Sequence, residues 1–142
     1  MENHCAGDGS WNMDELLDHT RNEIINYFGK PYMDFISLIA FSLKGGTVAI
    51  GFRMQKAVSY AVYDTQGNMI CTNVNVKSIM SSEMNQYDKM PLSQFAAQYG
   101  APHADIGSGV PLPVYFSDHG TFYKVFLTGN RISQIVECHF CP

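Results

Sequence analysis

A nine-residue motif occurs twice in this chain, 71 positions apart. Residues 27–35 read Tyr-Phe-Gly-Lys-Pro-Tyr-Met-Asp-Phe, and residues 98–106 read Gln-Tyr-Gly-Ala-Pro-His-Ala-Asp-Ile. Both copies contain an aromatic residue followed by Gly-x-Pro-x-x-Asp and an apolar residue, and each lies between a helix-like segment and several strand-like segments. An internal repeat constrains the architecture of the whole chain, more strongly than any local pattern does. The sequence therefore predicts two copies of one small α+β unit.

The repeat also predicts how the 142 residues are organised. We expect a flexible N-terminus at 1–13, a first α+β repeat at 14–76, a linker at 77–89 and a second repeat at 90–142. Units of about 70 residues are only marginally stable alone, so the two repeats should pack as one globular unit. The predicted fold class is α+β, with two tandem repeats that each consist of a short helical segment followed by an antiparallel β-meander. The hairpin loops are too short for parallel crossovers.

Helical apolar spacing predicts one helix that begins at Asp14 and ends before Gly29, and a second that begins near Pro91 and ends before Gly100. A glycine followed two residues later by a proline stops each helix. Asp105 is expected to bond its own loop amides, as a short acid does in turns. The residues predicted to act in caps and turns are Gly29, Pro31, Gly100, Pro102, Asp105, Gly107, Gly109 and Gly120.

Strand patterns follow each motif. Apolar runs and alternation predict the strands 35–43, 47–54, 57–63 and 69–76 in the first copy, and 114–117, 121–128 and 131–138 in the second. The turn glycines Gly45 and Gly120 are 75 positions apart, so the second copy contains four additional residues. We expect these four residues in the Gly-Ser-Gly-Val-Pro loop at 107–111.

Charge and hydropathy exclude some functions. The net charge is −4, and nine Lys and Arg residues are scattered without a basic run, which disfavours nucleic-acid binding. No apolar run approaches the roughly 18 residues of a membrane span. The first residues lack the basic and apolar regions of a signal peptide, so a cytoplasmic location is expected for the sequence as given. An envelope or secreted location applies if the natural chain is longer.

The cysteines lie at positions 5, 71, 138 and 141, a spacing unlike that of a small secreted disulfide scaffold, so we expect reduced thiols. Cys138, His139 and Cys141 are of the types that bind zinc. Only one Cys-x-x-Cys pair is present, however, and in a strand its two cysteines point to opposite faces. We therefore expect no metal and no cofactor.

Acidic and histidine residues lie close together at two places, His103 with Asp105 and Asp118 with His119. General acid–base catalysis requires hydrogen-bond reach and a shifted pKa, and sequence alone indicates neither. Ser108 lies between two glycines but follows a helix and precedes a strand, the reverse of a nucleophile elbow. The same Gly107-x-Gly109 segment lacks the helix and lysine of a phosphate loop. We expect no enzymatic activity.

The second copy resembles a known repeat. Residues 100–109, together with Pro113-Val114-Tyr115, Asp118-x-Gly120-Thr121 and Ile132-x-x-Ile135, resemble the repeat of the β-lactamase-inhibitor-protein-like and SmpA-like superfamily. The resemblance covers about residues 90–137 and, more weakly, 14–76. It implies a short helical segment coupled to an antiparallel sheet, often in tandem. It also implies a mostly non-enzymatic role, as an inhibitor of another protein, a small envelope-assembly lipoprotein or an appendage of a sensor protein.

We therefore hypothesise a non-catalytic protein-binding module, of the inhibitor or immunity type, which covers the functional surface of another protein. Alternation along 121–128 places Val125 and Leu127 in the core and Phe122, Lys124 and Phe126 on the opposite face. These three residues are the predicted partner contacts, unless the other repeat covers that face. The alternatives are a small-ligand or metal-binding sensor domain and an enzyme of unknown type.

Overall fold

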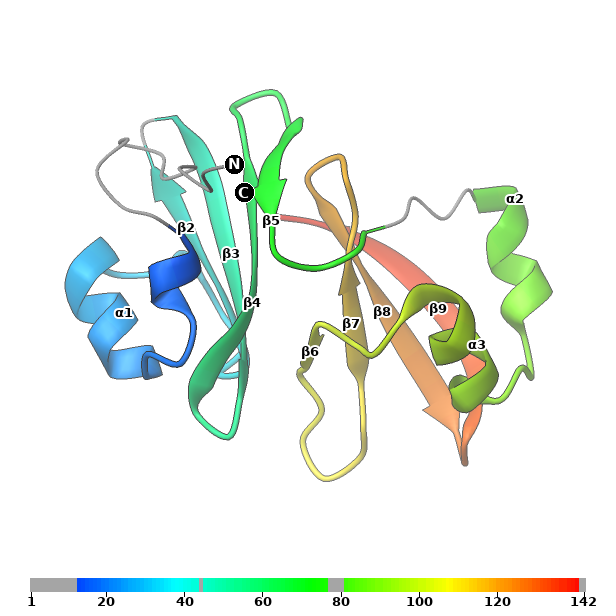
Figure 1. Cartoon of the computed structure of the whole chain (residues 1–142). Coiled ribbons are helices and arrows are strands. Elements are labelled where there is room, and N and C mark those ends of the chain that lie inside the picture. The colour runs from blue at the N-terminus through cyan, green and yellow to red at the C-terminus, as the bar shows by residue number, and fades with distance from the viewer. Residues whose placement is uncertain (1–12, 44, 77–80, 141–142) are drawn as a thin grey trace.

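The computed structural model of the chain describes residues 13–43, 45–76 and 81–140. It is an α+β protein with two antiparallel sheets (Figure 1). The first half contains the 3-10 helix η1 (Met13–Leu16) and the helix α1 (Arg21–Phe28). The second half contains the helices α2 (Ser81–Met84), η2 (Asn85–Tyr87) and α3 (Leu92–Tyr99). Neighbouring strands pair in sequence order, so each sheet is a meander.

The first sheet has five strands and the second has four. The strands of the first sheet are β1 (Met33–Asp34), β2 (Leu38–Leu43), β3 (Gly46–Arg53), β4 (Lys56–Tyr63) and β5 (Met69–Thr72). Those of the second sheet are β6 (Ala104–Asp105), β7 (Pro113–Phe116), β8 (Thr121–Thr128) and β9 (Arg131–His139).

The elements form four layers, in the order helix, sheet, sheet, helix (Figure 1). One apolar cluster, which includes Leu16 and Ile24, lies between the first helices and the five-stranded sheet. Another, which includes Phe95 and Tyr123, lies between the four-stranded sheet and the second helices. A central cluster joins the two sheets: Leu38, Ala40, Ala49, Ala61, Tyr63, Ala104, Val114, Phe116, Phe122 and Phe140. Both faces of each sheet are therefore covered.

Isolated β-bridges show how closely the two copies correspond. Thr20 bridges to Lys56 in the first copy, and Pro91 bridges to Arg131 in the second. Each bridge joins the residue that precedes the main helix to the first residue of β4 or of β9. The two ends of the second bridge lie 71 and 75 positions after those of the first, as the repeat predicts. The predicted fold class is thus confirmed.

Several predicted boundaries differ from the structure. A capping box at Thr20 starts α1, so the helix predicted from Asp14 is a separate 3-10 turn followed by a short helix. The strand predicted at 35–43 begins only at Leu38, and the strand predicted at 69–76 ends at Thr72. Residues 81–87, predicted as linker, are helical and correspond to η1 of the first copy. The predicted flexible terminus lies almost entirely outside the described residues.

The four additional residues of the second copy are split between two loops. The offset between equivalent paired residues is 71 at Asp105, 74 at Val114 and 75 at Lys124. Three additional residues therefore lie between β6 and β7, and the fourth lies in the turn between β7 and β8. The prediction that all four lie in the first of these loops is wrong, because alignment on glycines alone cannot place an insertion between them.

Gly29 and Gly100 end the two main helices in the same way. Their amides donate hydrogen bonds to the carbonyls of Ile25 and Ala96, at 2.8 and 2.7 Å. Their φ angles are +95° and +88°, a backbone conformation that residues other than glycine rarely adopt.

Replacement of Gly100 by Val should lower the free energy of unfolding by about 1 kcal/mol or more through backbone strain. A Cβ at this position meets no atom within 4 Å, so the cost comes from conformation and not from a clash. A urea denaturation curve measures the effect. An unchanged midpoint would contradict it.

Candidate functional site

The predicted contact residues of β8 do not lie on an open sheet face. Phe122 is 1% exposed and stacks on Phe140 in the core between the sheets, with ring centroids 4.6 Å apart. Lys124 is half-buried, and its Nζ lies 5.9 Å from the centroid of the Phe35 ring. Phe126 is half-buried. The prediction of Phe122 as an exposed contact is wrong because the sheet of the other repeat covers this face.

His103 is buried and joins the two halves of the protein. Its Nδ1 accepts a hydrogen bond of 2.8 Å from the amide of Phe116, and its ring has a further hydrogen bond with the backbone of Asn75. Its carbonyl accepts a 2.7 Å bond from the hydroxyl of Ser59 in β4. Burial lowers the pKa of His103 to about 4, because the charged ring loses its hydration. The ring is therefore neutral near pH 7 and serves the fold.

Asp105 organises the long loop between β6 and β7. Its Oδ1 accepts hydrogen bonds from the amides of Gly107 and Leu112, at 2.9 and 3.0 Å. Asp34 accepts a 2.9 Å bond from the amide of Ile36 in the equivalent turn of the first copy. The carboxylate thus has the local turn role that its sequence position predicts.

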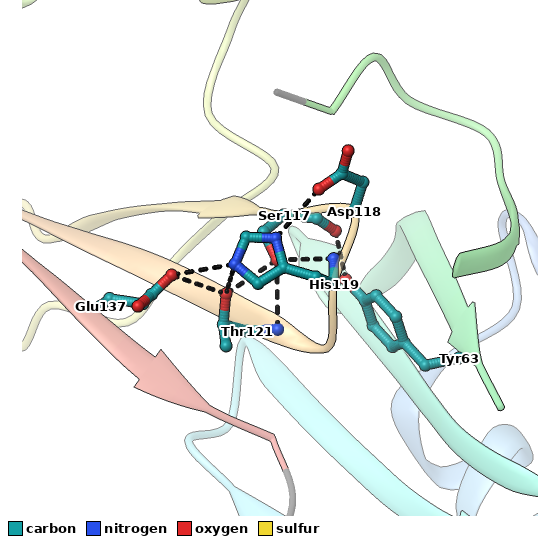
Figure 2. Close-up of polar contacts among 6 residues, drawn as sticks. All are labelled: Tyr63, Ser117, Asp118, His119, Thr121 and Glu137. Carbon is teal, nitrogen blue, oxygen red and sulfur yellow. Dashed lines mark hydrogen bonds and ion pairs between the residues drawn. The ribbon is translucent and has the colours of Figure 1, made fainter. Parts of the chain in front are cut away.

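A polar cluster lies at the turn between β7 and β8 (Figure 2). His119 contacts Asp118 through Nδ1 at 2.9 Å and Glu137 through Nε2 at 3.1 Å. The hydrogen bond with Asp118, followed by that with Glu137, raises the pKa of His119. Burial alone would raise the pKa of Glu137, but hydrogen bonds from His119 and Thr121 lower it. The imidazole is therefore held between two carboxylates that favour its charged form.

Buried hydroxyls complete this cluster. The hydroxyls of Ser117 and Thr121 lie 2.8 Å apart, and that of Thr121 lies 3.3 Å from the Nε2 of His119. The carbonyl of Ser117 accepts a 2.6 Å bond from the hydroxyl of Tyr63, which belongs to the other sheet (Figure 2). Ser117 is fully buried and Thr121 is 1% exposed. A carboxylate, an imidazole and a hydroxyl meet here, and because both hydroxyls are buried, their contacts fix the turn.

The residues predicted as possible metal ligands do not gather in a site that the structure describes. Cys138 is a free, half-buried thiol and His139 is exposed, whereas Cys141 lies outside the described residues. Across residues 13–43, 45–76 and 81–140, no three His, Cys, Asp or Glu side chains are placed to hold a metal ion.

Cys71 of β5 is disulfide-bonded. The expectation of reduced thiols is therefore wrong for Cys71. Disulfide formation depends on which cysteines the fold brings within about 7 Å between Cα atoms, and sequence spacing does not reveal that distance.

Exposed apolar side chains gather at the end of the sandwich opposite the polar cluster. They lie on the loop between β1 and β2, the turn between β3 and β4, and the loop between β6 and β7, at the bottom of Figure 1. Their exposed fractions are 39% for Phe35, 73% for Ile36, 91% for Met54 and 72% for Val110. We call these four residues the apolar end. A hydrogen bond of 2.8 Å from the amide of Phe52, near the end of β3, to the carbonyl of Ser37 joins this strand to the loop between β1 and β2.

A groove opens beside the apolar end. One part has a volume of about 340 Å³, and an adjoining part of about 330 Å³ reaches Met54. Both parts are lined by Arg53, Val58, Pro102 and His103, so the groove lies between the β3–β4 hairpin and the segment that follows α3. Arg53 is exposed and supplies a positive charge at the wall of the groove.

Sequence reasoning missed the apolar end and the groove because both are assembled from turns of the two copies. One signal was present. The turn Met54-Gln55 of the first copy corresponds to Gly129-Asn130 in the second, and a two-residue hairpin turn favours glycine or asparagine rather than methionine.

No helix in the described residues is long and apolar enough to cross a membrane. No protein-family model matches this chain, and the searches for similar curated proteins and solved structures found no match.

Proposed function

We propose that this protein is a non-catalytic protein-binding module of the inhibitor or immunity type, and that it contacts its partner through the apolar end. The single observation that carries this proposal is Met54. Among residues 13–43, 45–76 and 81–140 it is the most exposed large apolar residue, at 91%, and the backbone holds it at a φ of +53°.

The internal repeat makes the Met54 turn informative. Gly129 occupies the equivalent position of the second copy, with a φ of +66°. Glycine adopts this conformation without strain, whereas a residue with a Cβ loses about 1 kcal/mol. Strained backbone of this kind clusters at binding sites, where surrounding structure holds it in place. Met54 therefore lowers the stability of the fold through backbone strain, and a role in binding would explain why a methionine is present there.

Ile36 repeats the pattern in a neighbouring loop. Its φ is +72°, which is rare for a β-branched residue, and its side chain is 73% exposed. Gly107 occupies the equivalent position in the second copy, but its φ is not positive, so only the residue type and not the backbone conformation repeats the pattern of Gly129. Two apolar side chains are thus presented to solvent at positions where the other copy has glycine. Protein-binding surfaces rely on a few such anchors, with weaker contacts around them.

Replacement of Met54 by Gly should weaken partner binding strongly and leave the fold intact. Loss of a central anchor typically costs about 2 kcal/mol or more, which weakens binding about 30-fold. Relief of backbone strain should offset the flexibility of the new glycine, so the free energy of unfolding should change by less than about 0.5 kcal/mol. Wild type and variant serve as baits in extracts of the native host, with bound proteins compared by quantitative mass spectrometry.

Ile70→Ser is the matched control, because Ile70 is 50% exposed on β5, away from the apolar end. A partner retained by wild type and by Ile70→Ser, but lost with Met54→Gly, supports the proposal. A partner that binds Met54→Gly as tightly as it binds wild type places the interface elsewhere and overturns it.

A small-ligand function is the second candidate. The groove has the size of a small-molecule site, and the guanidinium of Arg53 would favour an anionic ligand. A ligand that binds wild type and Met54→Gly equally, in the absence of any protein partner, would favour this reading.

A further inference from the structure

The two sheets differ at one edge. In the first sheet, β4 is covered on its outer side by β5. In the second sheet, β9 corresponds to β4, but no strand in the described residues pairs with its outer side. At the start of β9, the amide of Ile132 donates a hydrogen bond to the carbonyl of Met90, and the carbonyl of Ile132 accepts one from the amide of Lys89. From Ser133 onward β9 is an edge strand. An open edge of this length presents unpaired backbone groups to other chains.

The correspondence between β4 and β9 holds residue by residue. The β3–β4 pairing shifts register between Gly51 and Phe52, and the β8–β9 pairing shifts between Phe126 and Leu127, 75 positions later. β5 pairs with Ala61, Val62 and Tyr63. The same offset maps these positions onto residues 136–138 of β9.

The outward backbone groups of β4 are all satisfied. The amide of Tyr60 donates a 2.8 Å bond to the side chain of Asn73, and its carbonyl accepts a 2.6 Å bond from the hydroxyl of Thr72. Ile135 corresponds to Tyr60, so its amide and carbonyl point outward from β9. No hydrogen bond to either group occurs within the described residues. A strand that followed the path of β5 would satisfy both groups.

A groove of about 440 Å³ adjoins the first part of this edge and ends next to residues 136–138, where the β5 pairing maps. Residues 132–135 of β9 form one side, and Met84, Asn85 and Asp88 of the adjoining helical segment form the other. The groove between the edge strand and the helical segment therefore lies beside the outward-pointing backbone groups of Ile135. In the first copy, the corresponding edge of β4 pairs with β5, a strand of four residues, Met69–Thr72.

We propose that the outer edge of β9 binds an extended peptide segment of a partner protein, which pairs antiparallel with β9 in the place that β5 occupies on β4. Backbone hydrogen bonds would provide affinity, and the groove would select side chains. This inference goes beyond the proposed function, because the edge contains no residue of the apolar end. A second copy of this chain fits less well. It would bring its own sheet against the helical segment, and both copies have a net charge of −4.

Amide hydrogen exchange tests whether the edge is open. The amides of Ile135 and Glu137 should exchange much faster than those of Tyr60 and Val62, their equivalents in the first copy. Slow exchange of Ile135 and Glu137 in a monomer would overturn the inference, because it would mean that another segment already covers the edge. Slow exchange in a dimer would overturn it in favour of self-association.

The binding probe is a synthetic peptide with the sequence of residues 67–75, with Cys71→Ser to avoid disulfide exchange. NMR should show shifts confined to residues 135–138 and slower exchange of the Ile135 amide. A matched peptide, N-methylated at alternate residues on its pairing edge, should not bind. Shifts confined to β4, or equal binding of the methylated peptide, would overturn the inference.

Variants at Glu137 test the backbone contact directly. Glu137→Pro removes the outward amide, a substitution that edge strands tolerate. Glu137→Ala keeps the amide and removes the same carboxylate. The Pro variant should lose at least tenfold in peptide affinity relative to the Ala variant, and equal affinities overturn the inference. If the Pro variant does not fold, the methylated peptide still decides. Met54→Gly should bind the peptide normally, so failure here and failure of the apolar end are distinguishable.

Discussion

Replacement of Phe122 by Ala should lower the free energy of unfolding by about 3–5 kcal/mol, the usual cost of removing a large aromatic side chain from a core. Phe122 is 1% exposed and belongs to the cluster between the two sheets. Its ring packs on Phe140, with ring centroids 4.6 Å apart. The effect is on stability and not on recognition.

Phe126→Ala is the matched control on the same strand, because its side chain is only half-buried. It should cost clearly less than Phe122→Ala. Urea denaturation of both variants, with equal m values, measures the difference. If the Phe122 variant were as stable as the Phe126 variant, the two sheets would not pack face to face in solution.

The strand β8 shows which structural features a sequence pattern can predict and which it cannot. Alternation separates Val125 from Phe122 and places them on opposite faces, as the structure has them. Alternation does not indicate what covers each face, because that depends on the packing of segments far apart in the chain. One sign of a doubly covered sheet was present. Apolar residues occupy both faces of β8, and an open face would be mostly polar.

The second sheet packs on small residues of the first. Ala40, Ala49 and Ala61 form the inner face of the five-stranded sheet, opposite large rings such as Phe116. The alternation of small and large residues in β2, β3 and β4 can be read from the sequence, but its meaning appears only when the partner sheet is known. The repeat motif predicted two similar units, whereas their mode of packing required the structure.

The candidate binding surfaces were harder to predict for a related reason. Each one is a difference between the two copies: Met54 in place of Gly129, and an uncovered β9 in place of a covered β4. A repeat search reports what the copies share, so it identified Gly29 and Asp105, which serve the fold. Function in a duplicated protein is more visible where the copies diverge.

Acidification from pH 6.5 to 4 should remove about 3 kcal/mol of stability through His103 alone. Its pKa is about 4 in the folded protein, because the buried ring resists protonation, and about 6.5 in the unfolded chain. A lowered pKa means that the unfolded state binds the proton first. The stabilising contribution is therefore fully present above pH 6.5 and is lost as the pH falls toward 4, at about 1.4 kcal/mol per pH unit.

His119 has the opposite effect on the pH dependence of stability, and it acts over a different pH range. Its raised pKa stabilises the folded state below pH 6.5, and this contribution is lost as the pH rises through the folded pKa. The His119 contribution grows toward lower pH and so does not account for a loss of stability below pH 6.5, which leaves the loss between pH 6.5 and about 4.5 as the measure of His103.

The comparison is between wild type and His103→Gln, with unfolding free energies from urea denaturation at half-unit steps of pH. Gln removes the titrating ring but retains groups that can bond the amide of Phe116 and the backbone of Asn75. The variant should be less stable at pH 7 and should show a flatter profile from pH 6.5 to 5. Below about pH 4.5 the carboxylates with lowered pKa values, such as Glu137, contribute to both proteins alike. Parallel profiles for the two proteins above that pH would show that His103 titrates normally and that water reaches the junction between the sheets.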